Sequence, residues 1–381
     1  MATQPFAPPG ASAAAHRTLA RLLEPADVVL GGSRPWDIVV HDPRMAARVL
    51  AQGSLGAGEA YMDGWWDCER LDDMLARLLR SGLDRRLRTA DAIMKSLLAL
   101  LRNPQGLRRA FIVGRSHYDV GDDLFERMLD PRMIYSCAWW EGASDLASAQ
   151  EAKLDLVCRK LGLERGMRVL DIGCGWGGAA RFAAERYGVT VTGITVSQNQ
   201  AATAAARCRD LPIEIRLEDY RRLTGRYDRI WSLGMFEHVG VRNYRRYLRK
   251  VRELLAPDGL FLLHTIGSNR SVRRTDPWIE KYIFPNSMLP SMAQVARAAE
   301  RLWVIEDWHG FGPHYDRTLL AWLHNFDAHW PELAARYGER FRRMWRYWLL
   351  GSAAAFRARR NQLWQFVLSP HGVPGGYRAV R

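Results

Sequence analysis

The sequence contains few cysteines and no long hydrophobic run. Its five cysteines form no C-x-x-C pair, so neither a disulfide framework nor a zinc knuckle is indicated, and a reducing cytoplasm is the simplest expectation. No stretch reaches the roughly 20 apolar residues of a membrane-spanning helix, and the first residues lack the basic start and apolar core of a secretory signal. We therefore expect a protein that is neither secreted nor transmembrane.

Acidic residues are outnumbered, since 55 Lys and Arg stand against 41 Asp and Glu, a formal net charge of +14. This balance favours an anionic partner, either a phospholipid surface or nucleic acid, and charge alone does not choose between them. The length of 381 residues exceeds one average domain and predicts two.

Residues 167–178, MRVLDIGCGWGG, join a buried-strand pattern to a glycine-rich turn. Val169, Leu170 and Ile172 predict the strand, and Asp171 lies near its carboxyl end. The glycines that follow let the backbone approach a ligand closely before a helix begins. They are Gly173, Gly175, Gly177 and Gly178.

This turn lacks two features of other nucleotide sites. The acid expected about 20 residues after a dinucleotide fingerprint is missing, because Ile194-Thr195-Val196 stands there, and no Lys-Ser/Thr pair follows the glycines. The remaining pattern, D-x-G-x-G-x-G, favours S-adenosylmethionine (SAM). A dinucleotide site, or a turn selected only for tight strand–helix packing, stays open on this motif alone.

The organisation of the chain changes near residue 110. Residues 1–110 predict a small α-rich domain, with helices at Ala14–Leu23, Met45–Ala51 and Leu71–Leu79 and a short strand at Trp36–Val40. The basic amphipathic stretch Leu83–Arg115 suits either an anionic membrane face or the solvated face of an interdomain helix.

Residues 111–381 predict an α/β domain with a doubly wound, parallel, open sheet. Strands alternate with helices, and the helix from Asn243 is expected to end at a Pro257-Asp258-Gly259 turn. Ligands are expected at the carboxyl ends of the strands, near the point where strand order reverses. The predicted strands are Arg168–Ile172, Val189–Ile194, Pro212–Leu217, Tyr227–Ser232, Leu260–Thr265, Val304–Trp308 and Leu363–Leu368.

Polar residues follow these strand ends. Thr195, Ser197 and Gln200 follow the second strand, and Glu218-Asp219-Tyr220 follow the third, where an acid can bond an adenine amine and an aromatic ring can stack. Glu237 and His264, after the fourth and fifth strands, are expected to converge above the sheet.

Motifs spread over nearly the whole chain belong together: they are Gly58–Trp66, Tyr135–Trp140, the glycine turn, Gly234–Gly240, Leu262–Gly267, Asp276-Pro277-Trp278, Tyr282–Asn286 and Asp307–Trp322. With this set the chain resembles the cyclopropane-fatty-acyl-phospholipid synthases. The resemblance implies a Rossmann-like, SAM-dependent methyltransferase fold with a small α-rich N-terminal domain. It also implies transfer of a methylene group from SAM to the cis double bond of an unsaturated acyl chain in a membrane phospholipid.

Such a reaction needs a dry pocket, because methyl transfer to an alkene leaves a carbocation that water would quench. Aromatic faces stabilise cations, although ordinary core packing explains any single aromatic equally well. The candidates are Trp139, Trp140, Phe236, Tyr282, Phe284 and Tyr315.

Ring closure also needs a base that removes a proton from the transferred methyl group. The resemblance implies a bound bicarbonate as this base, with Glu237 accepting from it and with His264 and Tyr315 donating to it. Its holders would be Cys137, Glu237, His264, Tyr315 and the backbone of Ile266. A covalent role for Cys137 is disfavoured because the reaction carries no acyl or glycosyl intermediate, and a metal site is disfavoured by the absence of ligand-like spacing.

For the cofactor, the resemblance implies binding by Tyr135, Ser136, Gly173, Gly175, Thr195, Ser197, Gln200, Asp219 and Tyr220. Two positions depart from the family pattern. Asp122 stands where relatives commonly carry Asn, and near the sulfonium its charge would alter cofactor affinity. Trp139 stands where many relatives have Tyr.

The partners follow from the same reading. The net charge and the Leu83–Arg115 stretch predict attraction to an anionic bilayer, and the resemblance implies a homodimer bound peripherally to the inner face of the membrane. A nucleic-acid partner is not expected, because the pocket predicted here carries an acid, a histidine and apolar residues in place of basic residues interleaved with aromatics. The runner-up function is methylation of the acyl alkene without ring closure.

Overall fold

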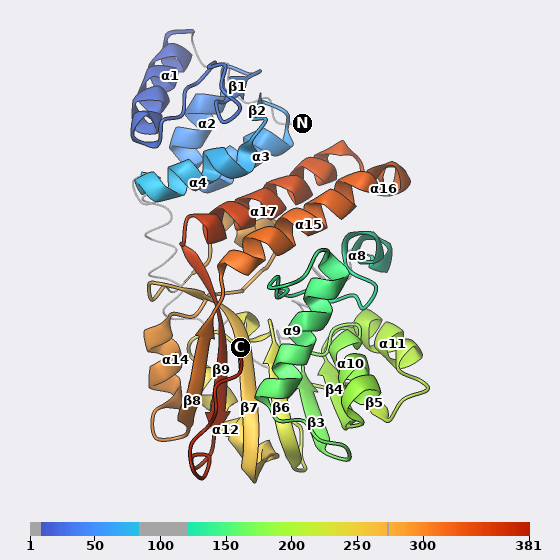
Figure 1. Cartoon of the computed structure of the whole chain (residues 1–381). Helices are drawn as coiled ribbons and strands as arrows, with labels where there is room; N and C mark the ends of the chain where they lie inside the picture. Colours follow the sequence, from blue (N-terminus) through green and yellow to red (C-terminus); the bar gives the residue numbers. More distant parts are fainter. Residues whose placement is uncertain (1–8, 84–120, 273) are drawn as a thin grey trace. The chain divides into compact units, whose positions relative to one another are not determined.

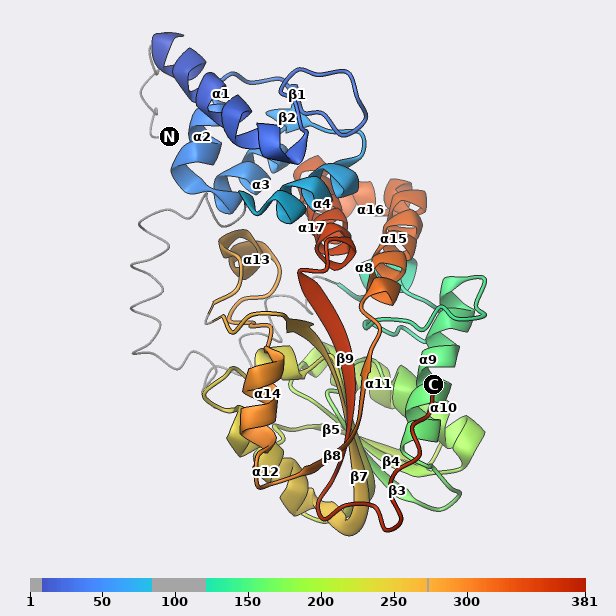
Figure 2. The same ribbon diagram turned by 60° about the vertical axis from the view of Figure 1, so that its left-hand side comes forward.

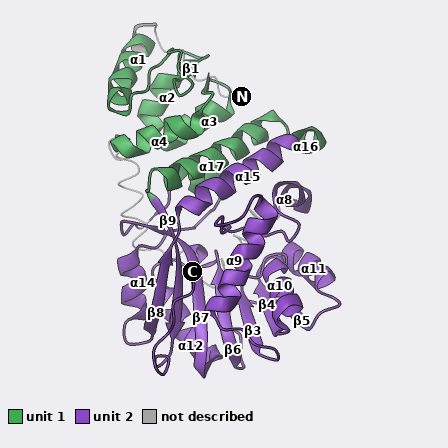
Figure 3. Ribbon diagram, viewed as in Figure 1, with its two compact units in different colours: residues 1–101, 276–283, 330–360 green, residues 102–275, 284–329, 361–381 purple. Residues whose placement is uncertain are grey.

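The computed structural model describes residues 9–83, 121–272 and 274–381 (Figure 1). It divides into two compact units: residues 1–101, 276–283 and 330–360, and residues 102–275, 284–329 and 361–381 (Figure 3). The first unit therefore differs from the predicted domain 1–110, since it takes in two later segments. Local sequence patterns cannot reveal this, because a helix pattern does not say which core it joins. None of the described helices is long and apolar enough to span a bilayer.

The first unit is α-rich, as predicted. The expected helices are present as α1 (Pro9–Leu23), α2 (Met45–Gln52) and α4 (Leu71–Ser81), and the expected strand shortens to β1 (Val39–Val40), which pairs with β2 (Trp66–Asp67). In the described part of this unit, four further α-helices are α3 (Ser54–Met62), α13 (Pro277–Tyr282), α16 (Trp330–Tyr337) and α17 (Glu339–Arg357).

Glu59 of α3 joins separate segments inside the first unit. Its carboxylate accepts from Arg48 at 2.6 Å, Lys281 at 2.6 Å and the Tyr282 hydroxyl at 2.8 Å. A buried carboxylate is tolerated when several donors satisfy it. The neighbouring Gly58 faces Trp278, whose ring leaves no room for a side chain at residue 58.

The second unit is built on a seven-stranded sheet with the order β5-β4-β3-β6-β7-β9-β8. The first five strands along the chain are parallel, but β9 runs antiparallel to both β7 and β8. The sheet is thus mixed, and the expectation of a fully parallel sheet is wrong for β9, which runs opposite to the other six strands; β8 pairs antiparallel with β9 and therefore has the same direction as the first five. Apolar patterns carry no strand direction. The strands are β3 (Arg168–Ile172), β4 (Thr190–Thr195), β5 (Ile213–Leu217), β6 (Tyr227–Leu233), β7 (Leu255–Ser268), β8 (Val304–Gly310) and β9 (Asn361–Ser369).

Strand β7 is longer than predicted at both ends. The expected turn at Pro257-Asp258-Gly259 lies inside β7, and the register with β6 shifts between Tyr227 and Arg229. The helix that precedes it, α12 (Tyr244–Leu254), ends directly at β7. Proline and glycine at a strand start therefore mark an irregular register here and not a separate turn.

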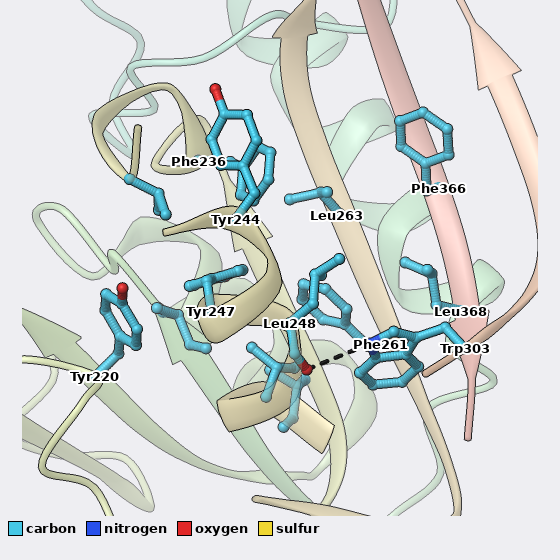
Figure 4. Packing of buried hydrophobic residues seen from close by; sticks show 14 of the residues in the cluster. Tyr220, Phe236, Tyr244, Tyr247, Leu248, Phe261, Leu263, Trp303, Phe366 and Leu368 are labelled. Atoms are coloured by element: carbon cyan, nitrogen blue, oxygen red, sulfur yellow. Dashed lines mark hydrogen bonds between the residues drawn. The ribbon is translucent and has the colours of Figure 1, made fainter. Parts of the chain in front are cut away.

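Helices cover both faces of this sheet (Figures 1 and 2). On one face α9 (Leu146–Lys160) and α10 (Gly178–Tyr187) pack on a cluster that includes Leu260 and Leu262, and on the other α12 and α14 (Met292–Ala299) pack on Phe261 and Leu263. This alternation along β7 follows from the two-residue period of a strand. Figure 4 shows the second cluster, in which Trp303 Nε1 donates to the carbonyl oxygen of Leu248 at 3.3 Å.

Strand order reverses around β3. The chain moves from β3 outward to β4 and β5, then returns to pair β6 with the other side of β3. Connections that leave in opposite directions open a crevice at the carboxyl ends of such strands. The glycine turn after β3 lies at this point.

Two glycine-to-alanine changes in the first unit are predicted to have opposite effects. A Cβ at Gly58 would lie 2.4 Å from the buried Trp278 ring, whereas a Cβ at Gly351 of α17 would meet Leu75 at an ordinary 3.7 Å. We expect Gly58→Ala to lower the free energy of unfolding by about 1–3 kcal/mol through overpacking. Gly351→Ala should raise it by roughly 0.5–1 kcal/mol through helix propensity. Urea unfolding of both variants measures the difference, and equal effects would contradict the packing at Gly58.

Candidate active site

A cavity of about 180 Å³ lies at the carboxyl ends of β3, β4, β5 and β6. The turns after these strands line it, together with the segment that holds Tyr135 and Ser136 and with Lys153 of α9. All nine residues predicted to bind the cofactor lie on its wall: Tyr135, Ser136, Gly173, Gly175, Thr195, Ser197, Gln200, Asp219 and Tyr220.

The glycine turn fits a ligand that lies against its backbone. Gly175 has a φ of 54°, and a Cβ built there meets no atom within 4 Å. Gly173 has a φ of 88°, and a Cβ there would lie 2.9 Å from Met235. Both positions favour glycine because left-handed backbone strains other residues.

After β4, a short hydrogen-bond chain orders the cavity wall. Ser197 caps α11 (Gln198–Arg207) by accepting from the Gln200 amide at 3.2 Å. Thr195 Oγ1 accepts from the Ser197 amide at 3.2 Å and donates to Gln200 Oε1 at 2.9 Å. The Gln200 side chain is thereby held in one orientation.

After β5, Asp219 is paired with Arg221, a residue that the sequence analysis did not single out. The guanidinium donates to both carboxylate oxygens, at 2.8 and 2.5 Å, and its Cζ lies 5.3 Å from the centroid of the Tyr220 ring. Burial raises the pKa of Tyr220 to about 12, so its hydroxyl stays protonated. An ordered carboxylate beside an aromatic ring suits an adenosine group.

Two ionisable groups on the cavity wall were not predicted as ligands. Asp171, at the end of β3, is buried, and its Oδ2 has no hydrogen-bond partner among the described residues. Burial raises the pKa of Asp171 to about 7. Lys153 is fully buried and donates to Ser136 Oγ at 2.9 Å. The sequence pattern could have indicated that Lys153 is buried, because this lysine shares the buried face of α9 with Leu154 and Val157.

A second group of polar side chains centres on Glu237, in the short helix η4 (Phe236–His238) after β6. Its Oε1 accepts from the Ile266 amide at 2.6 Å, while its Oε2 has no hydrogen-bond partner among the described residues. Burial raises the pKa of Glu237 to about 7, although the amides of Glu237 and Ile266 oppose this shift. The carboxyl group therefore changes charge near neutral pH.

His264 lies two residues before Ile266 on β7, on the same face of the strand. Its Nδ1 is 3.2 Å from Gln365 Nε2, and in the tautomer that accepts a hydrogen bond from this amide the proton of the neutral ring lies on Nε2. Burial, with the charges of Lys153 and Lys160, lowers the pKa of His264 well below its usual value. Nε2 has no partner in the described part of the chain and remains a free donor.

The remaining two predicted catalytic side chains are Cys137, which follows the cavity residue Ser136, and Tyr315 on α15 (Pro313–Ala328). Cys137 is completely buried, its Sγ donates to the Ala138 carbonyl at 3.2 Å, and burial raises the pKa of its thiol. A protonated thiol argues against a covalent nucleophile. Tyr315 contacts Trp322, which also contacts the ring of Tyr135 on the cavity wall.

None of Cys137, Glu237, His264, Ile266 and Tyr315 lines the cavity itself. The two groups are adjacent along the chain, however, because Cys137 follows Ser136 and Glu237 follows the β6 turn that lines the cavity. The arrangement is a cavity next to a buried polar cluster in which Glu237 Oε2 and His264 Nε2 have no hydrogen-bond partner among the described residues.

Thr318 connects this cluster to α15 and was missed by the sequence analysis. Its Oγ1 accepts from the Ala138 amide at 3.1 Å and from Trp140 Nε1 at 2.9 Å, and it donates to the His314 carbonyl at 2.8 Å. Nothing in the local sequence separates this threonine from other buried threonines, because its partners lie about 180 residues away.

The two departures from the family pattern have structural roles. Asp122 accepts from Trp176 Nε1 at 2.9 Å, from Asn199 at 2.7 Å and from Thr203 at 2.7 Å, and it does not line the cavity. Its charge is thus satisfied by neutral donors and is not directed at the cofactor. Trp139 stacks on His314, with ring centroids 4.5 Å apart.

Two of the aromatic candidates have other partners in the structure. Phe236 stacks on Tyr244 at 4.2 Å inside the hydrophobic cluster of Figure 4, so core packing is its role. Tyr282 belongs to the first unit, where it donates to Glu59. Aromatic residues carry no sequence signal that separates core packing from a pocket wall.

The sheet with its glycine turn, the reversal of strand order and the cavity along four strand ends define a SAM-dependent methyltransferase of Rossmann-like fold. Its residues fit that methyl donor, since the turn leaves open space above Gly175 and the wall carries buried groups of both charges. Within the described residues, no group of three or more His, Cys, Asp or Glu side chains is placed to hold a metal ion.

Comparison with known proteins identifies the family. A family model described as mycolic acid cyclopropane synthetase matches residues 105–366, and the chain belongs to this family. It is 52% identical over 367 residues, 96% of each chain, to the cyclopropane-fatty-acyl-phospholipid synthase of Escherichia coli (strain K12).

Solved structures agree with this assignment. The cyclopropane synthase MmaA2 of Mycobacterium tuberculosis is 34% identical with a TM-score of 0.63, and the alignment covers 68% of this chain and 97% of that one. The mycolic acid cyclopropane synthase CmaA1 complexed with SAH and CTAB gives the same identity, TM-score and coverage. The protein is therefore an enzyme of the cyclopropane synthase class that uses SAM as its methyl donor.

The raised pKa of Glu237 links stability to pH. Above pH 4.5 the unfolded chain ionises this carboxyl group, while the folded protein keeps it protonated until about pH 7, so its contribution to stability is present at low pH and is lost as the pH rises. We expect Glu237→Gln to gain about 3 kcal/mol over the wild type between pH 4 and pH 8. Urea unfolding at both pH values measures this gain. The exposed Glu253→Gln is the control, and an equal gain there would contradict the burial effect.

Removal of the Thr318 hydroxyl should disturb the polar cluster. Thr318→Val leaves the buried Ala138 amide and Trp140 indole without an acceptor, and we expect a loss of about 2–3 kcal/mol in unfolding free energy. Thr318→Ser keeps the hydroxyl and should lose only about 1 kcal/mol, for one methyl group. Thermal or urea unfolding compares the two, and similar losses would mean that the hydrogen bonds contribute little.

Proposed function

We propose that this enzyme transfers a methylene group from SAM to the cis double bond of unsaturated acyl chains in membrane phospholipids and forms a cyclopropane ring, with bound bicarbonate as general base. The observation that carries this proposal is that two buried atoms, Glu237 Oε2 and His264 Nε2, have no hydrogen-bond partner among the residues that the structure describes. A buried polar atom without a partner costs free energy unless a ligand satisfies it. An acceptor and a donor together suit a small ligand that both donates and accepts, as bicarbonate does.

When bound, SAM supplies the electrophilic methyl group, and the acyl alkene supplies the electron pair for the new bond. The protein has to hold the two reactants close together and exclude water, because positioning provides much of the rate. The cluster of Cys137, Glu237 and His264 is almost entirely buried, which supports a dry site. Burial also keeps the Cys137 thiol protonated, and its S–H donates to the Ala138 carbonyl.

When bound, bicarbonate supplies the base that accepts a proton from the transferred methyl group. We assign Glu237 to accept from it and His264 and Tyr315 to donate to it. The Ile266 amide already donates to Glu237, and the Ile266 carbonyl accepts from Thr265 Oγ1 at 3.0 Å. Its backbone thus orients the carboxyl group, and Gln365 orients His264 in the same way.

We further propose that the enzyme is a homodimer that acts on the inner face of the membrane. The net charge of +14 supports attraction to anionic headgroups. The first unit is the candidate for lipid docking or a dimer contact, and the exposed Val304, Ile305 and Trp308 on edge strand β8 offer a second apolar contact surface. The basic stretch at Leu83–Arg115 lies outside the described residues apart from Leu83.

Incubation with SAM and vesicles of unsaturated phospholipid tests the reaction, followed by mass analysis of the acyl chains. We expect a gain of one methylene group and a product that resists mild hydrogenation, faster with anionic vesicles at low salt and faster with added bicarbonate. A product that is readily hydrogenated would indicate methylation without ring closure. No gain of mass with bicarbonate present would contradict the proposal.

The same assay tests the base. Glu237→Gln should lower turnover by about 100-fold or more, as expected for a positioned acid–base group, while its affinity for SAM stays within a few-fold of the wild type. Glu253→Gln should leave both unchanged. Unaltered turnover in Glu237→Gln would remove this residue from the mechanism.

A further inference from the structure

Lys153 is a buried cation without a counter-ion. Its side chain is fully buried on α9, it lines the cofactor cavity, and no carboxylate in the described residues lies within 4.0 Å of its Nζ. An ammonium group in such a place is costly unless an anion compensates it. Burial lowers the pKa of Lys153 to about 8, which still leaves it mostly charged at neutral pH.

Asp130 and Asp171 favour the charged form of Lys153 through space, but neither forms an ion pair with it. Asp130 uses both oxygens for backbone amides, accepting from Ile134 at 2.9 Å and from Arg132 at 2.9 Å. Asp171 shares the cavity wall but leaves Oδ2 without a partner. A direct ionic partner for Lys153 is therefore missing among the described residues, and an anionic group bound in the cavity can supply it.

The hydrogen bond between Lys153 and Ser136 indicates which chemical group the two residues can bind together. An ammonium group can only donate, so Ser136 Oγ accepts at 2.9 Å and its own proton is free to be donated onward. Two further N–H groups of Lys153 are also available. This pair presents a set of donors with a positive charge behind it, which is the arrangement that binds a carboxylate.

We propose that Lys153, with Ser136, binds the carboxylate at the methionine end of SAM. SAM carries a sulfonium, an ammonium and one carboxylate, so the carboxylate is its only anionic group. A cation on the wall of this cavity can therefore complement only that part of the cofactor. The second fully buried lysine of α9, Lys160, differs because it has partners in His309 at 2.9 Å and Asp307 at 3.7 Å and does not line the cavity.

Binding of two ligands that differ only in the carboxylate tests this assignment. S-adenosylhomocysteine has the carboxylate, and its decarboxylated analogue, 5′-(3-aminopropylthio)-5′-deoxyadenosine, lacks it. We expect the wild type to prefer S-adenosylhomocysteine by about 10- to 100-fold in Kd, the range of a charged hydrogen bond. Lys153→Met should lose most of this preference by weakening only the carboxylate ligand, and Lys153→Arg should keep part of it. Calorimetry with the full chain measures each Kd.

Lys160→Met is the matched control, because it removes a buried lysine from the same helix outside the cavity, and it should leave the preference unchanged. If Lys153→Met does not fold, Ser136→Ala provides the second test and should weaken S-adenosylhomocysteine more than the analogue. Equal weakening of both ligands, or no preference in the wild type, would overturn the assignment. The measurement needs neither lipid nor bicarbonate, so its outcome is independent of the function proposed above.

Discussion

The reversal of strand order around β3 is the constraint on which the functional part of this protein depends. With β4 on one side of β3 and β6 on the other, the chain leaves the sheet in opposite directions. The backbone then cannot close over the carboxyl ends of these strands, and a crevice remains. The glycine turn, the Ser197 cap, Asp219 and the β6 turn all reach the same cavity because each directly follows one of these strands.

Burial of ionisable groups gives the site its chemical character. Four ionisable side chains are all buried: Lys153, Asp171, Glu237 and His264. Burial lowers the pKa of the lysine and the histidine and raises that of the two acids, and each shift favours the neutral form of the group. Glu59 in the first unit is also buried, but three donors satisfy its carboxylate, and these hydrogen bonds link separate segments of that unit. Polar groups that are left unsatisfied reduce stability, so their concentration beside one cavity indicates that ligands complete the site.

The sequence predicted the elements of the sheet well because strands, caps and glycine turns are local patterns. Arg168–Ile172 was predicted with its observed bounds, and Ser197, placed after the second predicted strand, caps the helix that follows β4. The predictions of the direction of β9 and of the start of β7 were wrong, because direction and register depend on pairing partners far away in the chain. The later segments of the first unit were missed for the same reason.

For the site, the residue types and their places after strand ends were enough to predict a SAM cavity, and the family motifs extended this to individual residues. The sequence by itself determined the glycine turn and the polar residues that follow each strand, because backbone conformation and strand period act over a few residues. Only the tertiary structure decided that Lys153 faces the cavity without a counter-ion, that Thr318 holds Ala138 and Trp140, and that Asp122 is satisfied by neutral donors. Charge compensation and hydrogen bonding depend on distances between residues that are remote in sequence, and folding alone sets those distances.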